Sequence, residues 1–344
     1  YEICACLVGS EMCIRDRFKM MVGDMVNEKQ KGLAYSIQSF LCNAGSLVGF
    51  LFPFIFTWIG ISNIAPQGVV PDSVIYSFYI GAAILILCVI YTTVKVKEMP
   101  PAEYAEYHGI TEEEEKEKIN MVKLLIKAPK AFWTVGLVQF FCWFAFMFMW
   151  TYTNGSVAAN VFDAPTVETA VNGVSKVMLD TKSIQYQDAA DWVGVLFAVQ
   201  AIGSVLWAVC IPLFKDRKLI YSLSLVLGGL GFISTYFVHN QYVLFISFLL
   251  IGCAWAAMLA LPFTILTNAL SGGHMGTYLG LFNGTICIPQ IVAASLGGSI
   301  LALFTPKGML PPEINMLVMA GVMLIIGAVC VYLIKETKGE QTKA

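Results

Sequence analysis

Charged residues are scarce in this chain of 344 residues: Asp, Glu, Lys and Arg make up 13% of it, and hydrophobic residues make up 58%. A soluble globular domain has about 25% charged and about 45 to 50% apolar residues. The few charges also cluster in short polar segments, so the formal net charge of -2 says nothing about nucleic acid, and we expect no nucleic-acid partner. The composition excludes an ordinary soluble domain and predicts a protein that crosses a membrane several times.

Paired cysteines and clustered histidines are absent as well. Outside the first 17 residues, each cysteine lies inside an apolar run with no metal-type or paired spacing, which is typical of small apolar side chains that pack between helices. The three histidines, His108, His239 and His274, fall in polar loops on different sides. This pattern predicts no metal site and no cofactor, and it disfavours a membrane-embedded transferase, so we expect no enzyme.

The first 17 residues, YEICACLVGSEMCIRDR, fit no membrane span and no capped helix. A secretory signal needs a basic start, an apolar stretch of roughly 7 to 15 residues and a small-residue cleavage site, and none of these is present. Back-translated, the stretch resembles a short-read sequencing adapter with its index and transposase end. We therefore expect residues 1–17 to be an artefact, and the gene sequence to begin inside the gene at Phe18.

Apolar stretches of about 20 residues are long enough to cross a bilayer as helices. Eight stretches of the remaining chain meet this length, and a short apolar remnant, FKMMVG, precedes the first of them. The eight predicted spans are 33–58, 74–96, 131–153, 190–214, 219–238, 241–266, 276–304 and 312–334.

Lysine and arginine gather in alternate loops, which predicts the orientation of these spans because cytoplasmic loops carry the excess of positive charge. The lysine-rich loops include 95–130 and 215–218, and the C-terminal tail, whereas the opposite loops hold only Lys176, Lys182 and Lys307. We expect a multi-pass protein of a bacterial inner membrane with its C-terminus in the cytoplasm. The segment 154–189 then becomes an unusually long external loop.

The longest polar stretch lies between the second and third spans, and six spans follow it. Two spans and a remnant precede it, which suggests two six-helix halves with the front of the first half missing. A weak repeat agrees, because Asp24 stands eight residues before Gly32 and Asn268 eight residues before Gly276. The predicted organisation is 18–96 as the end of the first bundle, 97–130 as a central cytoplasmic loop, 131–335 as the second bundle and 336–344 as a tail.

Three segments carry a resemblance to a known family: FKMMVGDMVNEKQKGLAYSIQSF, FKDRKLIYS, and WAAMLALPFTILTNALSGGHMGTYLGLFNGTICIPQIVA. From Phe18 to about Lys335 the chain resembles the major facilitator superfamily, in its glycoside-pentoside-hexuronide and sucrose/maltose-transporter branch. The resemblance implies an all-α major facilitator fold, here the fifth to twelfth of twelve transmembrane helices. It also implies a monomeric secondary transporter that moves a sugar, such as maltose or sucrose, with a proton by alternating access.

Polar and aromatic residues within the spans are the candidates for substrate contacts, because polar side chains in a membrane are costly and face the bundle interior. Amides can hydrogen-bond sugar hydroxyls and indole rings can stack on the CH face of a sugar. Trp150, in contrast, lies near the outer end of its span and is expected in the aromatic belt at the membrane surface. The substrate-binding candidates are Gln38, Asn43, Gln139, Trp143, Gln200, Trp255, Asn283 and Gln290.

Helix packing is the competing interpretation for several of these positions, and for the glycines at 276, 280 and 284 it is the favoured one. Asn283 and Gln290 share one helical face, and Pro289 frees a backbone carbonyl between them. If the candidates bind a sugar, Asn43, Gln139, Asn283 and Gln290 should converge on one cavity.

The charged turns on the cytoplasmic side resemble the gating loops of the family. Where the family usually has an arginine five residues before the loop aspartate, this chain has Lys19. Charges at helix ends can pair in one access state only and so bias the equilibrium between states. Simple positive-inside anchoring is the alternative for the lysines. The candidate gating residues are Lys19, Asp24, Lys29, Lys31, Asp216, Arg217 and Lys218.

No Asp or Glu lies well inside a predicted span after Gln38. A proton symporter needs a titratable group along its pathway, so a coupling carboxylate is expected in helices that precede this sequence, and the fragment alone is expected not to transport. A membrane sensor on the same fold is disfavoured by the short tail KETKGEQTKA. Transport of a non-sugar molecule, drug export included, stays an alternative because polar amides do not define a sugar.

Overall fold

The computed structural model describes residues 31–61, 72–96, 121–171, 174–214, 216–269, 275–306 and 308–334. The predictions for residues 1–17, for Lys19, Asp24 and Lys29, for most of the central loop and for the tail lie outside these ranges. Lys31 is the first residue of a helix, and its side chain is not described.

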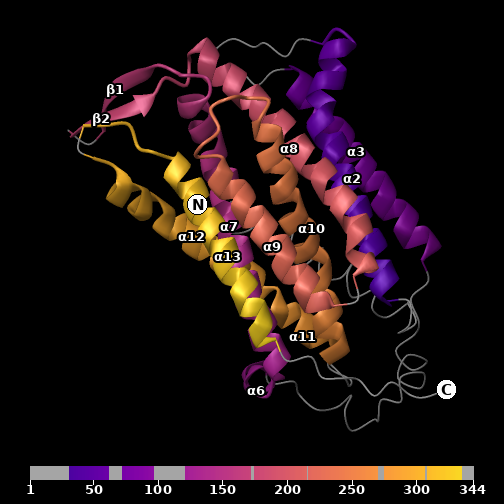
Figure 1. Cartoon of the computed structure of the whole chain (residues 1–344). Coiled ribbons are helices and arrows are strands. Elements are labelled where there is room, and N and C mark those ends of the chain that lie inside the picture. The colour runs from indigo at the N-terminus through magenta and orange to yellow at the C-terminus, as the bar shows by residue number, and fades with distance from the viewer. Residues whose placement is uncertain are drawn as a thin grey trace, which may run out of the picture.

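The described chain is a helical bundle with one small β-hairpin at one end (Figure 1). The helices are α2 (Lys31–Trp58), α3 (Asp72–Lys95), α6 (Met121–Ile126), α7 (Lys130–Asn160), α8 (Ile184–Cys210), α9 (Arg217–Ser234), α10 (Leu244–Ala269), α11 (Met275–Phe282), α12 (Gly284–Phe304) and α13 (Ile314–Cys330). Short 3-10 turns, η1 (Ile211–Leu213) and η2 (Val331–Leu333), extend α8 and α13. The hairpin consists of β1 (Thr166–Val171) and β2 (Val174–Leu179).

The predicted spans correspond to these helices. In the described part of the chain, seven helical segments are long and apolar enough to cross a membrane, namely α3, α7, α8 with η1, α9, α10, α11 with α12, and α13 with η2. The eighth predicted span coincides with α2, a helix of 28 residues with an apolar stretch from Phe40 to Phe52. The expected all-α polytopic membrane fold is confirmed.

The segment between α7 and α8 is more ordered than a loop. Helix α7 continues to Asn160, seven residues beyond the predicted end of its span, and the antiparallel pair β1 and β2 follows, with Thr166 opposite Leu179 and Val171 opposite Val174. Valine recurs in both strands and threonine recurs in β1, which suits paired strands. We call the end of the bundle where this hairpin lies the hairpin end.

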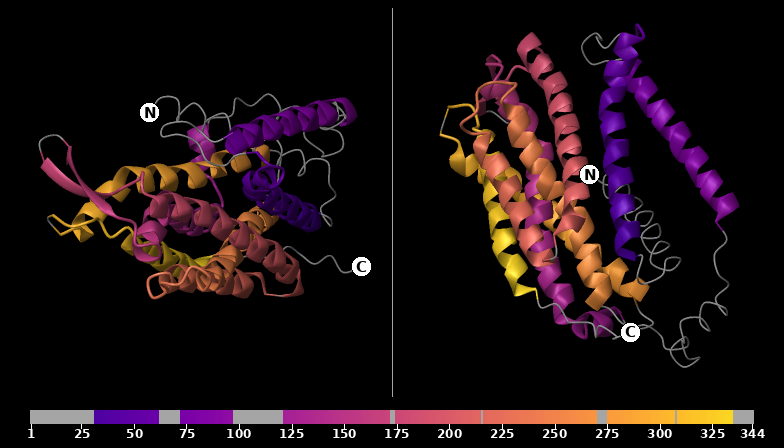
Figure 2. Two further views of the ribbon diagram at one scale, coloured as in Figure 1. Left: turned by 90° about the horizontal axis from the view of Figure 1, so that it is seen from above. Right: turned by 45° about the vertical axis from the view of Figure 1, so that its right-hand side comes forward.

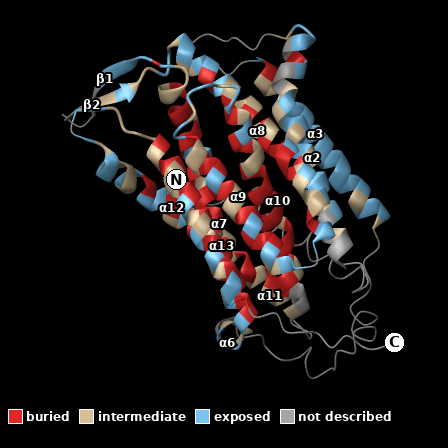
Figure 3. Cartoon of the chain, in the orientation of Figure 1, coloured by how far each residue is buried: buried red, intermediate tan, exposed pale blue. Residues whose placement is uncertain are grey.

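Helices α7, α9, α10 and α13 form the buried centre, and α3 is exposed along most of its length (Figure 3). Helix α2 runs beside α8, and α3 leans on α2 away from the other helices (Figure 2). Because α3 is apolar and exposed along most of its length, it presents a surface suited to lipid or to further helices.

Close helix contacts use glycines other than those expected from the sequence. A Cβ added at Gly203 of α8 would lie 2.6 Å from the carbonyl oxygen of Leu249 in α10, and one added at Gly321 of α13 would lie 2.6 Å from that of Gly229 in α9. At Gly280 an added Cβ meets no described atom within 4 Å. The packing role expected for Gly280 is therefore not observed, whereas α8 with α10 and α9 with α13 approach closely through small residues.

Candidate functional site

One face of α7 carries Gln139, Trp143, Phe146 and Trp150 at intervals of four, three and four residues, so their side chains lie above one another. Gln139 and Trp143 are 1% and 4% exposed, and Phe146 is fully buried. Trp150 is 44% exposed. The stripe predicted from the sequence therefore faces into the bundle and becomes accessible toward the hairpin end.

The Gln139 side chain is held by a hydrogen bond to a backbone carbonyl that a proline in α10 leaves without its helical partner. Pro262 lies inside α10 and has no N–H, so the carbonyl of Met258, four residues earlier, loses its helical hydrogen bond. The Gln139 side-chain nitrogen Nε2 donates to this carbonyl at 2.9 Å. The amide oxygen Oε1 is buried and has no hydrogen-bond partner among the described residues. Gln139 thus stabilises α10 and still offers one acceptor.

Three tryptophans and a phenylalanine meet beside Gln139, on α7 and α10. The Trp255 ring of α10 lies edge-on to Trp143, with centroids 5.8 Å apart, and edge-on to Trp150 at 5.8 Å. Phe146 packs 4.9 Å from Trp255. The indole nitrogen Nε1 of Trp143 is buried without a described hydrogen-bond partner. We call Trp143, Phe146, Trp150 and Trp255 the aromatic cluster.

Helix α8 brings Gln200 to its interface with α10, where Gln200 is 6% exposed. A Cβ added at Gly252 of α10 would clash with the Gln200 carbonyl and lie 2.7 Å from the backbone nitrogen of Ser204. Further along α8, Trp207 donates from Nε1 to the hydroxyl of Ser224 in α9 at 2.8 Å. This part of α8 therefore packs closely against α9 and α10. Helix packing is the interpretation that competes with a substrate role for Gln200.

The span 276–304 has a local irregularity at Asn283, where the backbone stays helical (φ -63°, ψ -22°). Asn283 separates α11 from α12, and its side chain is 4% exposed. Phe282 packs against Phe132 of α7 at 5.7 Å and Phe263 of α10 at 5.8 Å, so the irregularity lies against the same two helices as the aromatic cluster. Pro289 lies inside α12 as expected, and Gln290 is half-buried.

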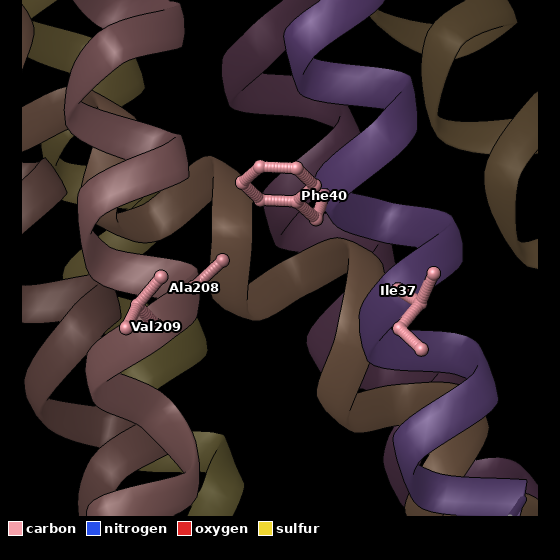
Figure 4. A pocket seen from close by; sticks show the side chains of 4 residues that line it. All are labelled: Ile37, Phe40, Ala208 and Val209. Carbon is pink, nitrogen blue, oxygen red and sulfur yellow. The ribbon is translucent and has the colours of Figure 1, made fainter.

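On α2, Asn43 is 1% exposed and Gln38 is half-buried. A cavity of about 160 Å³ opens between α2 and α8, lined by Ile37, Phe40, Ala208 and Val209 (Figure 4). None of the predicted substrate residues lines it. The convergence of Asn43, Gln139, Asn283 and Gln290 on one cavity stays a prediction.

Asp216 has a local structural role at the start of α9. Its carboxylate oxygen Oδ1 accepts from the backbone N–H groups of Lys218 at 3.0 Å and Leu219 at 3.1 Å, so Asp216 is the N-cap of the helix. Arg217 is exposed and Lys218 half-buried. The capping bonds account for an aspartate at this position, and a gating role would be additional.

Glu313 is a residue that the sequence did not single out. It precedes α13 at the hairpin end, half-buried, and a Cβ added at Gly155 of α7 would overlap its carboxylate. Burial raises the pKa of Glu313 from its ordinary value of 4.5 to about 7. In the sequence it stands at the very start of the predicted span 312–334, beside two prolines, and its contact with a glycine of α7 becomes apparent only in three dimensions.

Comparison with known proteins identifies the family. Two overlapping parts of the chain, residues 19–175 and 157–344, match the family model of the Major Facilitator Superfamily. The chain belongs to the Major Facilitator Superfamily, whose members are membrane transporters rather than enzymes. No curated protein matches the chain.

Among solved structures, the chain is similar to a crystal structure of the E. coli fucose:proton symporter FucP, in a single-residue variant. The two are 14% identical, with a TM-score of 0.58 over 93% of this chain and 73% of that chain. At this identity the likeness establishes the fold.

Proposed function

We propose that this chain is part of a proton-coupled transporter that takes up a sugar, a glucoside or a disaccharide such as maltose or sucrose, by alternating access. Membership of a transporter superfamily supports the general activity. The similarity in fold to a protein described as a fucose:proton symporter supports a sugar and a proton as the transported species.

The observation that carries the sugar proposal is the polar chemistry beside the aromatic cluster. Gln139 Oε1 is a buried acceptor and Trp143 Nε1 is a buried donor, and neither is satisfied within the described structure. Leaving such groups unpaired costs about 1 to 3 kcal/mol each, so a ligand that pairs them gains affinity. A sugar hydroxyl both donates and accepts, and the adjoining rings suit the apolar face of the same sugar.

The substrate site would draw on both halves of the transporter. Gln38 and Asn43 belong to the part before the central loop, and Gln139, Trp143, Gln200, Trp255, Asn283 and Gln290 to the bundle after it. We assign the cytoplasmic gating role to Lys19, Asp24, Lys29 and Lys31 and to Asp216, Arg217 and Lys218.

The proposed orientation follows from the loop charges. The hairpin end is then external, and the C-terminus is cytoplasmic in a bacterial inner membrane. We place the protein in the glycoside-pentoside-hexuronide and sucrose/maltose branch, acting as a monomer.

The test is uptake by the intact protein, recovered from its gene and reconstituted in liposomes. Radiolabelled maltose, sucrose and fucose are supplied separately, with and without an inwardly directed proton gradient. We expect one of the sugars to accumulate, and a protonophore to abolish the accumulation. Transport of a lipophilic cation with no sugar uptake would overturn the sugar assignment, and sugar uptake unaffected by the protonophore would overturn proton coupling.

A further inference from the structure

We propose that Trp150, together with Trp255, forms an aromatic subsite for the apolar face of the transported sugar, on the hairpin side of Gln139 and Trp143. The proposal rests on the proposed sugar transport. It adds Trp150 to the substrate site, although the position of Trp150 near the end of its span predicted a place in the membrane-surface belt.

The exposed surface of Trp150 lies on a different side of α7 from the other large exposed residues of that helix. Trp133 is 52% exposed and Leu137 is 41% exposed. At 3.6 residues per turn, Trp150 lies about 140° around the helix from Leu137 and about 100° from Trp133. Helix α7 therefore has two accessible sides, and Trp150 shares its side with the buried Trp143 and Gln139.

The Trp150 ring packs against other rings of the aromatic cluster, whereas a residue of the membrane-surface belt would extend toward lipid. Its centroid is 5.8 Å from Trp255 at an interplanar angle of 81°, and 6.4 Å from both Trp143 and Phe146. Seven residues along a helix span about 10.5 Å, so the rings of Trp143 and Trp150 lean toward each other. Trp150 is thus the accessible outer ring of a cluster whose inner rings are buried.

This arrangement suits a ring-shaped, hydroxylated ligand. Trp150 and the half-buried Trp255 present indole surfaces, and the unsatisfied Trp143 Nε1 and Gln139 Oε1 lie further inside on the same stripe. A sugar needs both kinds of contact, because its CH face is apolar and its hydroxyls must remain hydrogen-bonded. A lipophilic cation could also use the rings, but it would leave the inner donor and acceptor unpaired.

The experiment measures KM for the sugar that the intact wild-type protein transports, in Trp150→Leu, Trp150→Phe and Trp133→Leu. Leucine keeps apolar volume without an aromatic face, phenylalanine restores a ring, and Trp133 is the matched control on the other side of α7. We expect Trp150→Leu to raise KM about two- to tenfold, Trp150→Phe to recover part of the loss, and Trp133→Leu to leave KM unchanged.

A second measurement does not depend on the leucine variant folding. The intact protein is labelled with 5-fluorotryptophan, and the resonance missing in Trp150→Phe is assigned to Trp150 by 19F NMR. We expect the transported sugar, but not mannitol, to shift this resonance. An unchanged resonance and an unchanged KM in a protein that transports sugar would overturn the subsite, whereas absence of any sugar transport by the wild type would overturn the proposed function itself.

Discussion

At the scale of single residues, Gln139 and Pro262 act as a pair, because the glutamine supplies the donor that the proline withholds from the Met258 carbonyl. Replacing Gln139 by leucine leaves this buried carbonyl unpaired. We expect Gln139→Leu to lower the free energy of unfolding by about 1 to 3 kcal/mol, measured as a lower thermal midpoint of the purified protein in detergent.

The control is the second member of the pair. Pro262→Ala restores the helical N–H, so the double variant should lose less stability than the sum of the two single variants. If the losses simply add, the hydrogen bond between the helices is not what Gln139 contributes.

Glu313 provides a pH dependence with a definite sign. Its pKa is raised from 4.5 to about 7 by burial, so between these values the folded protein keeps a proton that the unfolded chain releases. The stabilisation is complete below pH 4.5 and declines as the pH rises to about 7, by on the order of 3 kcal/mol in total.

Replacing Glu313 by glutamine, which cannot ionise, should therefore flatten the stability profile between pH 4.5 and 7. The measurement is the thermal midpoint of both proteins across this range. Equal slopes for the two proteins would show that the pKa of Glu313 is the same in the folded and unfolded states.

At the scale of helices, the contact between α8 and α10 depends on Gly252. A methyl group there would meet backbone atoms of Gln200 and Ser204, which cannot move without shifting α8. We expect Gly252→Ala to destabilise the protein, whereas Gly280→Ala, where an added Cβ meets no described atom within 4 Å, should be neutral or stabilising by about 0.5 to 1 kcal/mol. Thermal midpoints of the two variants compare them directly, and the opposite order would contradict the packing.

The helices could be predicted because the length of each apolar run shows whether it can cross a bilayer as a helix. Hydropathy does not show how far a helix continues beyond the membrane, so the extension of α7 to Asn160 and the hairpin after it were not predicted. Pro289 indicated an irregularity in its span, but the observed irregularity is at Asn283, next to Phe282, which packs between α7 and α10. A tertiary contact of this kind has no local sequence signal.

Only part of the candidate site could be predicted, because the sequence shows spacing along one helix but not contacts between helices. Helical spacing was enough to place Gln139 and Trp143 on one buried face. It could not reveal that Gln139 donates to α10, or that Trp255 of another helix packs against both Trp143 and Trp150, since these contacts join residues more than 100 positions apart.

At the scale of the whole molecule, the seam between α2 and α8 differs at its two ends. Toward the hairpin end the rings of Phe50 and Phe197 lie 5.8 Å apart, whereas toward the other end Ile37 and Phe40 face Ala208 and Val209 across a cavity. If the two halves rock during transport, the Phe50 and Phe197 contact must open in each cycle.

Cysteines at positions 50 and 197, in a background without the native cysteines, should therefore cross-link readily with a short bifunctional reagent. We expect the cross-link to stop uptake in liposomes and cleavage of a reducible linker to restore it. The single cysteine variants treated in the same way should keep their activity. Full uptake by the cross-linked protein would mean that this seam stays closed throughout the cycle.

The hydrogen bond from Gln139 to the Met258 carbonyl also constrains which substitutions related sequences can accept at positions 139 and 262. A lineage that lost Pro262 would regain the N–H of α10, and selection on position 139 to supply a donor would relax. A lineage that lost Gln139 first would carry an unpaired carbonyl inside the bundle until a compensating change arose. We therefore expect glutamine and proline at these two positions to be inherited together, with an apolar residue at 139 only where 262 is no longer proline.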